Sequence, residues 1–154
     1  MRELCWHAVA VRHQHERRVA KALESNGVEM FVPLYRARRR WSDRVKEIDA
    51  PLFPGYVFAR GNALRAPGVI RIVGRIEDAE IGDIRKAVES KLALGPWPYL
   101  KAGDRVRIRE GPLRGVEGTL LREQDCQRLV IAIELLKRSI TVELEPEMVM
   151  EASV

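Results

Sequence analysis

Two histidines and a glutamate, His13, His15 and Glu16, are the residues whose types and spacing could begin a metal site. On a strand, residues two apart share a face, so both imidazoles could reach one ion. No third ligand follows at a convincing spacing, and a solvent-facing helix start explains the group better. The sequence also contains no phosphate loop of the P-loop or Rossmann type and no nucleophile elbow. We therefore expect a non-enzymatic protein without a metal or cofactor.

The cysteines and the apolar runs indicate the compartment. Cys5 and Cys126 are far apart in the chain, each in a strand-like run, which favours two buried free thiols in a reducing environment. The first residues lack the apolar core of a signal peptide, and no apolar run approaches the ~20 residues of a membrane span. A cytoplasmic protein that does not contact a membrane is expected.

The positive charge of the chain is concentrated in its first part. The formal net charge is +5, with 18 Lys and Arg against 12 Asp and Glu in residues 1–92, but 9 against 10 in residues 93–154. An uneven balance of this kind indicates that only the first part meets a polyanion. A solubilising surface charge remains the alternative explanation.

An apolar, aromatic-rich stretch runs from Pro51 to Phe58. Tyr56, Val57 and Phe58 predict a strand, because β-branched and aromatic residues fit a half-buried pleated surface. Alternation places Tyr56 and Phe58 on one face and Val57 on the other. Both faces are apolar, so one is expected to join the core and the other to meet further protein, from this chain or from a partner.

The elements around this stretch predict an α+β unit in which helices cover one mostly antiparallel sheet. Apolar runs predict strands and spacings of three and four predict helices. The expected strands are 4–11, 28–35, 56–60 and 69–74, and the expected helices are 15–26 and 79–92. Gly27 is expected to end the first helix. Residues 30–50 are expected to form a long hairpin with a basic tip.

The pattern changes near residues 95–101, which contain prolines and two aromatic residues and are expected to separate two domains. Only short strands and turns follow, and five such strands in about fifty residues fit a small barrel. The segment 129–138 lacks a strong strand-breaker and would also tolerate a helix.

Two sets of motifs carry a resemblance to a known family. Residues 103–108 and 111–118 resemble the KOW motif, an apolar–basic alternation followed by Gly-Pro, an apolar residue and Gly-x-x-Gly, with Leu113 where an aromatic residue is usual. The first part resembles the N-terminal (NGN) domain of the NusG family of bacterial transcription elongation factors. The motifs that carry this second likeness are Trp6, Phe31-Val32-Pro33, Phe53-Pro54-Gly55-Tyr56-Val57 and Pro67-Gly68-Val69.

The resemblance implies the domain organisation. An NGN-like domain at 1–92 would be followed by a linker at 93–102 and by a KOW domain with a five-stranded SH3-like barrel at 103–154. The short chain and its Pro51-Leu52-Phe53 lead-in are more similar to a specialised paralogue of the RfaH type than to the general factor.

The resemblance also implies a monomeric transcription elongation or antitermination factor that binds the clamp helices of the largest RNA polymerase subunit and suppresses pausing or termination. The residues that correspond to the polymerase-binding surface are Ala10, Val32, Pro33, Phe53, Tyr56 and Phe58. By the same likeness, the basic region of Arg12, His15, Arg18, Arg71 and Arg75 would face the non-template DNA strand. Arg38, Arg39 and Arg40 on the hairpin could touch DNA or the polymerase and complete the candidate nucleic-acid-binding residues.

For the second domain the resemblance implies recruitment of ribosomal protein S10 or of the termination factor Rho. The candidate partner-binding residues are Ile108, Leu113, Val116, Leu135 and Leu136, of which Ile108 and Val116 also fit a core role. Some relatives refold this domain as a helical hairpin that masks the polymerase site, and the helix-tolerant segment 129–138 leaves this open. An RNA- or ribosome-binding KOW protein of the translation machinery is the alternative function.

Overall fold

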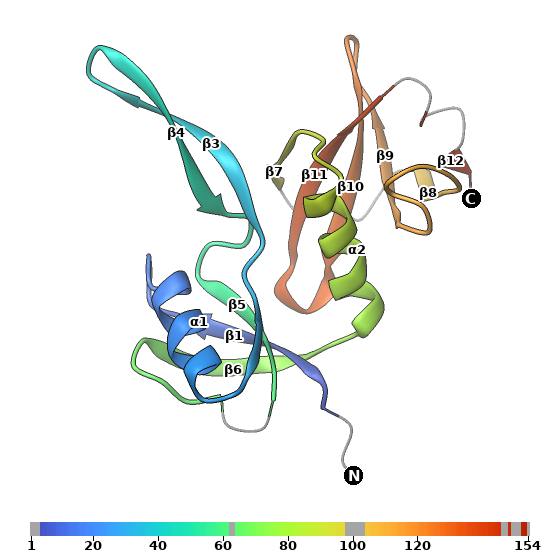
Figure 1. The fold of residues 1–154 in the computed structure, drawn as a ribbon. Helices are drawn as coiled ribbons and strands as arrows, with labels where there is room; N and C mark the ends of the chain where they lie inside the picture. The colour runs from blue at the N-terminus through green and yellow to red at the C-terminus, as the bar shows by residue number, and fades with distance from the viewer. Residues whose placement is uncertain (1–3, 62–63, 98–103, 146–147, 149–151, 154) are drawn as a thin grey trace. The chain divides into compact units, whose positions relative to one another are not determined.

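The computed structural model describes residues 4–61, 64–97, 104–145, 148 and 152–153. Within them the chain forms two α-helices, one 3-10 turn and three antiparallel sheets (Figure 1). The chain divides into two compact units, the first made of Met1–Pro33 and Phe53–Ile81, and the second of Leu34–Leu52 and Gly82–Val154. The predicted α+β class with antiparallel sheets is confirmed, whereas the domain limits 1–92, 93–102 and 103–154 stay a prediction.

Unit 1 is built on a four-stranded sheet with the order β2-β5-β1-β6. Its strands are β1 (Trp6–Val11), β2 (Glu29–Phe31), β5 (Tyr56–Arg60) and β6 (Val69–Ile76). All three pairings are antiparallel. β1 lies between β5 and β6 and contains no Asp, Glu, Lys or Arg, and β6 is an edge strand.

Helix α1 (Glu16–Ser25) packs on one face of this sheet. Val19 and Leu23 form the predicted apolar stripe of the helix and meet Val9, Val11 and Val57 of the sheet in one buried cluster. The helix ends at Gly27 as predicted. Gly27 has φ +81°, its N–H bonds the carbonyl of Glu24, and the N–H of Val28 bonds that of Leu23. These two bonds are the Schellman pattern, which favours glycine because its φ is positive.

Unit 2 contains a separate two-stranded hairpin, β3 (Leu34–Trp41) and β4 (Arg44–Pro51), that turns at Ser42 and Asp43. The predicted hairpin at 30–50 is therefore corrected at its start. Residues 29–31 form β2 and pair with β5 in unit 1 instead. Pro33 explains the break, since it is followed by a change of sheet and cannot donate a ladder hydrogen bond.

The largest sheet of unit 2 has the order β12-β8-β9-β10-β11-β7, six strands where the sequence predicted five. Its strands are β7 (Leu94–Trp97), β8 (Asp104–Ile108), β9 (Glu117–Arg122), β10 (Gln127–Ile133), β11 (Arg138–Leu144) and β12 (Ala152–Ser153). The additional pairing comes from β7, which lies in the segment expected as a linker and pairs with β11.

The helix-tolerant segment 129–138 is mainly strand here. β10 continues to Ile133, and the 3-10 turn η1 (Glu134–Leu136) and Lys137, with φ +51°, lead into β11. The run of β-branched residues in β10 favours the strand. Helix α2 (Asp78–Glu89) begins close to the predicted position. Neither helix in the described part of the chain has the length and apolar character that crossing a membrane requires.

Candidate functional site

A tight turn precedes β5 and sets the position of Tyr56. The N–H of Tyr56 donates to the carbonyl of Phe53 over 3.0 Å, and Gly55 has φ +87°. Proline at the second position and glycine at the third are what a type II turn requires. The Phe53-Pro54-Gly55-Tyr56 motif is therefore a turn that starts a strand.

Glu16, in the first turn of α1, stabilises the Phe53–Tyr56 turn by a hydrogen bond. Glu16 is only 5% exposed, and its carboxylate accepts a 2.9 Å hydrogen bond from the N–H of Gly55. The carbonyl of Gly55 accepts a second bond, also 2.9 Å, from the N–H of Val11 in β1. Sequence reasoning considered Glu16 as a weak metal ligand and as the start of the first helix, and it missed this contact with Gly55. The one feature of the sequence that could have indicated this contact is the position of an acidic residue at the start of a helix.

The aromatic residues of this region differ in accessibility. Phe53 and Phe58 are 1% and 0% exposed, and their rings meet edge to face at 5.5 Å. Phe31 lies 6.2 Å from Phe58. Tyr56, in contrast, is half-buried. Of the three aromatic residues expected to contact polymerase, two are packed inside the folded chain and Tyr56 keeps an accessible part.

The other three residues of the expected polymerase surface, Ala10, Val32 and Pro33, do not lie together on one accessible face. Ala10 is half-buried and pairs directly with Tyr56 across β1 and β5, so both lie on one face of the sheet. Pro33 is buried, and Val32 packs against the cluster under α1, on the opposite face. The structure thus brings Ala10 and Tyr56 together and does not bring Val32 to them.

Arg71 extends the Ala10–Tyr56 pair to the edge of the sheet. Ala10 pairs with Tyr56 on one side and with Arg71 on the other, giving the row Tyr56–Ala10–Arg71 across β5, β1 and β6. We call these three residues the cross-strand row. Arg71 is exposed and, with Arg65, lines an open hollow of about 440 Å³ beside β6.

Arg75 does not join this face. The register of β6 shifts by one residue between Ala8 and Val9 and again between Ala10 and Val11. Residues four apart on a regular strand share a face, but the extra residue at Val73 reverses the alternation. Arg75 consequently pairs with His7, on the face opposite Arg71. The two arginines, expected in one nucleic-acid site, point to opposite sides of the sheet.

Arg12 and His15 meet at the turn before β6. The N–H of Arg12 donates to the carbonyl of Gly68 over 2.8 Å, and His15 lies so close to Gly68 that a β-carbon there would be 3.2 Å from its Nδ1. Gly68 has φ +99°, which also disfavours other residues. The side chains of Arg12 and Arg18 are exposed, while His15 is half-buried.

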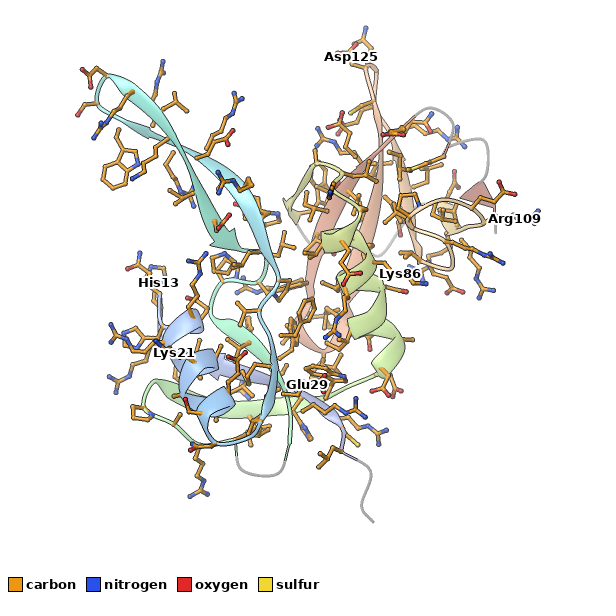
Figure 2. The ribbon with its side chains drawn as sticks, in the orientation of Figure 1. His13, Lys21, Glu29, Lys86, Arg109 and Asp125 are labelled. Atoms are coloured by element: carbon orange, nitrogen blue, oxygen red, sulfur yellow. The ribbon has the colours of Figure 1, made fainter. Side chains whose placement is uncertain are left out.

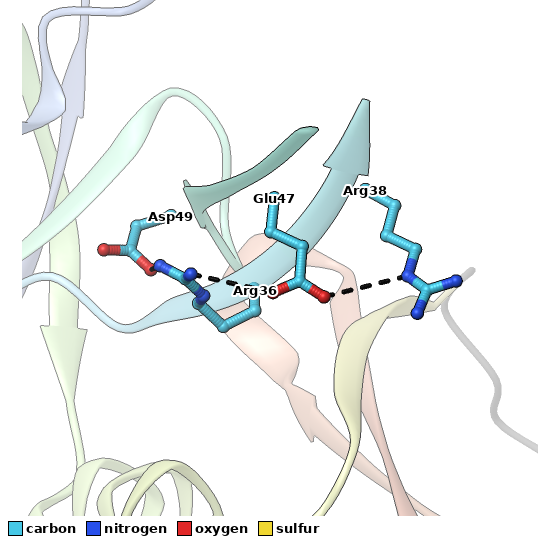
Figure 3. A network of polar contacts seen from close by, with 4 residues as sticks. All are labelled: Arg36, Arg38, Glu47 and Asp49. Atoms are coloured by element: carbon cyan, nitrogen blue, oxygen red, sulfur yellow. Dashed lines mark hydrogen bonds and ion pairs between the residues drawn. The ribbon is translucent and has the colours of Figure 1, made fainter. Parts of the chain in front are cut away.

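The β3–β4 hairpin presents two chemically different faces. Direct pairing puts Arg36, Arg38 and Arg40 on one face with Asp49, Glu47 and Val45, and we call this the paired face. Arg36 bonds Asp49 at 3.1 Å and lies 3.6 Å from Glu47, while Arg38 lies 3.8 Å from Glu47 (Figure 3). The hydrogen bond to Asp49 raises the pKa of Arg36 above its usual value.

The opposite face of the same hairpin carries Arg39, Trp41, Arg44 and Lys46 toward its tip, and we call these four residues the open face. Arg38, Arg39 and Arg40 form one basic run in the sequence and were all candidates for contact with DNA or polymerase. Because strand residues alternate, Arg39 lies on the open face and its two neighbours lie on the paired face.

The candidate partner-binding residues of unit 2 are mostly core. Ile108, Leu113 and Val116 are 0% exposed, and Leu136 is 8% exposed. Leu135 is 43% exposed and is the accessible member of the five. Charged residues occupy the loops, with Arg109 after β8 and Asp125 at the tip of the β9–β10 turn (Figure 2). Arg107 bonds Glu117 of the neighbouring strand, and this contact lowers the pKa of Glu117.

No group of three or more His, Cys, Asp or Glu side chains that could hold a metal ion occurs among the described residues. His13 is exposed near the start of α1 (Figure 2), and Glu16 is turned toward Gly55. Cys5 and Cys126 are free thiols as predicted, but both are half-buried rather than fully buried.

Comparisons with known proteins identify the family. The family model described as transcription termination factor NusG matches residues 4–86, which is more than half of the chain and includes the cross-strand row. The transcription termination/antitermination protein NusG of Helicobacter pylori is 23% identical over 90% of this chain and 93% of its own. A solved structure described as domain interaction in Thermotoga maritima NusG covers 98% of this chain and 97% of its own, with a TM-score of 0.55 and 23% identity, and so shares the fold. The chain belongs to the NusG family of transcription factors.

Proposed function

We propose that this chain is a non-enzymatic transcription elongation or antitermination factor that binds RNA polymerase through unit 1. Its target would be the clamp helices of the largest subunit, and its effect the suppression of pausing or termination. Family membership supports the general role. The single observation that carries the binding site is the cross-strand row, in which a half-buried tyrosine and a half-buried alanine lie side by side next to an exposed arginine.

The cross-strand row offers less apolar burial, and so less binding free energy, than a docking site of three accessible aromatic rings would. Full burial of one large apolar side chain contributes about 1.5–3 kcal/mol, whereas a micromolar complex needs about 8 kcal/mol. Phe53 and Phe58 are buried and contact each other, so we assign the direct contact with polymerase to Tyr56 rather than to these two rings. The remaining affinity must come from further contacts around Ala10 and Tyr56.

Arg12, His15 and Arg71 would contact the non-template DNA strand while the factor is bound to polymerase. Arg12 and Arg71 are exposed, and Arg65 adds a cation beside Arg71. Arginine bonds phosphate in a bidentate manner and can stack on an unpaired base. Arg75 is left out of this contact because it lies on the opposite face.

Unit 2 would recruit a second protein, with ribosomal protein S10 and Rho as the candidates. Leu135 is the residue we propose for this contact, because the other four apolar candidates are buried. A monomeric, operon-specific factor of the RfaH type acting in the cytoplasm remains our proposal for the biological setting.

Recovery from cell extract tests the proposed function against the ribosomal alternative. The tagged chain is expected to retain RNA polymerase after nuclease treatment, and purified polymerase should bind the purified chain directly. In single-round transcription the factor should shorten a defined pause. Retention of ribosomes without polymerase would overturn the proposal and favour the translation-linked alternative.

A further inference from the structure

The open face of the hairpin combines three cations with an accessible indole. Arg39 pairs with Lys46 and Trp41 pairs with Arg44, so the four side chains form two adjacent rungs of one face. Two residues along a strand span about 6.8 Å, which keeps the rungs within reach of one extended ligand. Trp41 is 60% exposed, and Arg39, Arg44 and Lys46 are exposed as well. Asp43 lies in the turn beyond the last pair and belongs to neither face.

The two faces of the hairpin differ in how far carboxylates compensate their cations. On the paired face Glu47 and Asp49 compensate Arg36 and Arg38 through ion pairs (Figure 3). The open face contains no carboxylate, since its partners nearer the base of the hairpin are Tyr35, Ala37, Ile48 and Ala50. The positive potential of the hairpin is therefore greatest on the open face, although both faces carry three cations.

We propose that the open face binds single-stranded DNA, with phosphates held by Arg39, Arg44 and Lys46 and one base stacked on Trp41. Cations beside an accessible aromatic ring are the combination by which proteins bind single strands without sequence preference. An unpaired base is required because a base inside a duplex has no free face for the indole. The four side chains can only donate hydrogen bonds, and a phosphate oxygen and a ribose 2′-hydroxyl oxygen both accept them, so these side chains do not select RNA over DNA.

The open face would add a second contact to the DNA contact proposed above for Arg12, His15 and Arg71. Only the role of the bound strand in transcription rests on the proposed function. The binding itself is measured without polymerase, on the full chain, so its failure is distinguishable from a failure of the proposed function. The probe is a fluorescent oligothymidylate of about 12 nucleotides, within the ~4–16 nucleotides that small single-strand-binding folds cover.

Two triple variants with the same change in charge separate the open face from net charge. Changing Arg39, Arg44 and Lys46 to Gln is expected to lower affinity at least about tenfold. It should also reduce the salt slope by about 2, because each phosphate contact on a single strand contributes about 0.7. Changing Arg36, Arg38 and Arg40 to Gln should lower affinity less than about threefold. Equal losses in the two variants, or no binding by the unmodified chain, would overturn the proposal.

Substitutions of Trp41 test base stacking without changing the net charge of the chain. Trp41→Ala should weaken binding roughly 5- to 150-fold, the range that corresponds to about 1–3 kcal/mol per stacked base, and Trp41→Phe should retain most of the affinity. The oligonucleotide should quench the tryptophan fluorescence of the unmodified chain, and this quenching should disappear in Trp41→Phe. Quenching that persists in Trp41→Phe would contradict stacking at this site.

Two further probes test whether the ligand must be single-stranded and whether RNA is preferred to DNA. A duplex of the same length should bind at least about tenfold more weakly than the single strand, and oligouridylate should bind within about threefold of oligothymidylate. A duplex preference, or a preference for RNA above about tenfold, would overturn the assignment to single-stranded DNA. Polymerase binding of the open-face variant should be unchanged, since the cross-strand row is intact.

Discussion

The carboxylate of Glu16 and the backbone N–H of Gly55 are joined by a 2.9 Å hydrogen bond, although 39 residues separate them in the chain. Because the carbonyl of Gly55 also accepts from Val11, the turn before β5 is fixed to both α1 and β1. Tyr56 follows this turn immediately. The accessible tyrosine of the proposed polymerase surface thus follows a turn that is held by a buried acid, a contact that sequence reasoning missed.

Loss of the Glu16 acceptor should destabilise the chain. Glu16→Ala leaves the half-buried N–H of Gly55 without its partner and is expected to lower the free energy of unfolding by about 1–3 kcal/mol. Glu16→Gln keeps an acceptor oxygen but loses the charge near the helix N-terminus, so the loss should be smaller, about 1 kcal/mol. Urea unfolding measures both. Equal losses would show that the hydrogen bond does not matter.

Two glycine substitutions should change the free energy of unfolding in opposite directions. Gly55→Ala meets no atom within 4 Å, but φ +87° strains an L-residue, so we expect a loss of about 1–2 kcal/mol. Gly82→Ala also meets no atom within 4 Å and lies inside α2, where alanine should add about 0.5–1 kcal/mol. Thermal unfolding of the two variants gives the comparison. A stabilising Gly55→Ala would contradict the turn geometry described here.

Arg71 and Arg75 should respond differently to charge reversal. Arg71→Glu alters the face that carries the cross-strand row and is expected to weaken cross-linking to the non-template strand on the order of tenfold, while polymerase affinity is largely retained. Arg75→Glu makes the same change in charge on the opposite face and should have an effect below about threefold. Photo-cross-linking in a polymerase complex measures both, and indistinguishable variants would refute the division between the faces.

Glu117 should titrate at low pH because of its contact with Arg107. A hydrogen bond and the charge of Arg107 lower the pKa of Glu117 from its ordinary value of 4.5, with a smaller contribution from Arg105. The small stabilisation from this pair is present above pH 4.5 and is lost as the pH falls through the lowered pKa. Carboxyl NMR measures the titration. Arg107→Gln should raise the pKa of Glu117, and an unchanged titration would exclude the contact in solution.

Local patterns predicted much of the fold. The alternation and spacing of apolar residues located α1, α2 and most strands, and Gly27 marked the end of α1, because these features depend on neighbours in the chain. The start of the hairpin was misplaced because the pattern of residues 28–35 is continuous, and only the pairing with β5 assigns residues 29–31 to unit 1. β7 was missed because prolines and glycine in residues 95–98 are typical of linkers.

The candidate site was predicted less well, since it depends on contacts between distant residues. Nothing in the local sequence distinguishes Phe53 and Phe58, which are buried, from Tyr56, which is half-buried. The extra residue in β6 that separates Arg71 from Arg75 has no residue signature, because it arises from pairing with β1. Similarly, only the register of the hairpin reveals that Arg39 lies apart from Arg38 and Arg40.

The affinity of Tyr56 variants for purified RNA polymerase tests the central proposal most directly. Tyr56→Ala should weaken binding about 30-fold, corresponding to about 2 kcal/mol of lost apolar burial, whereas Tyr56→Phe should stay within about threefold of the unmodified chain. Trp41→Ala removes an exposed aromatic residue elsewhere and should leave the affinity unchanged. If a folded Tyr56→Ala variant binds polymerase as tightly as the unmodified chain, the cross-strand row is not the polymerase-binding surface.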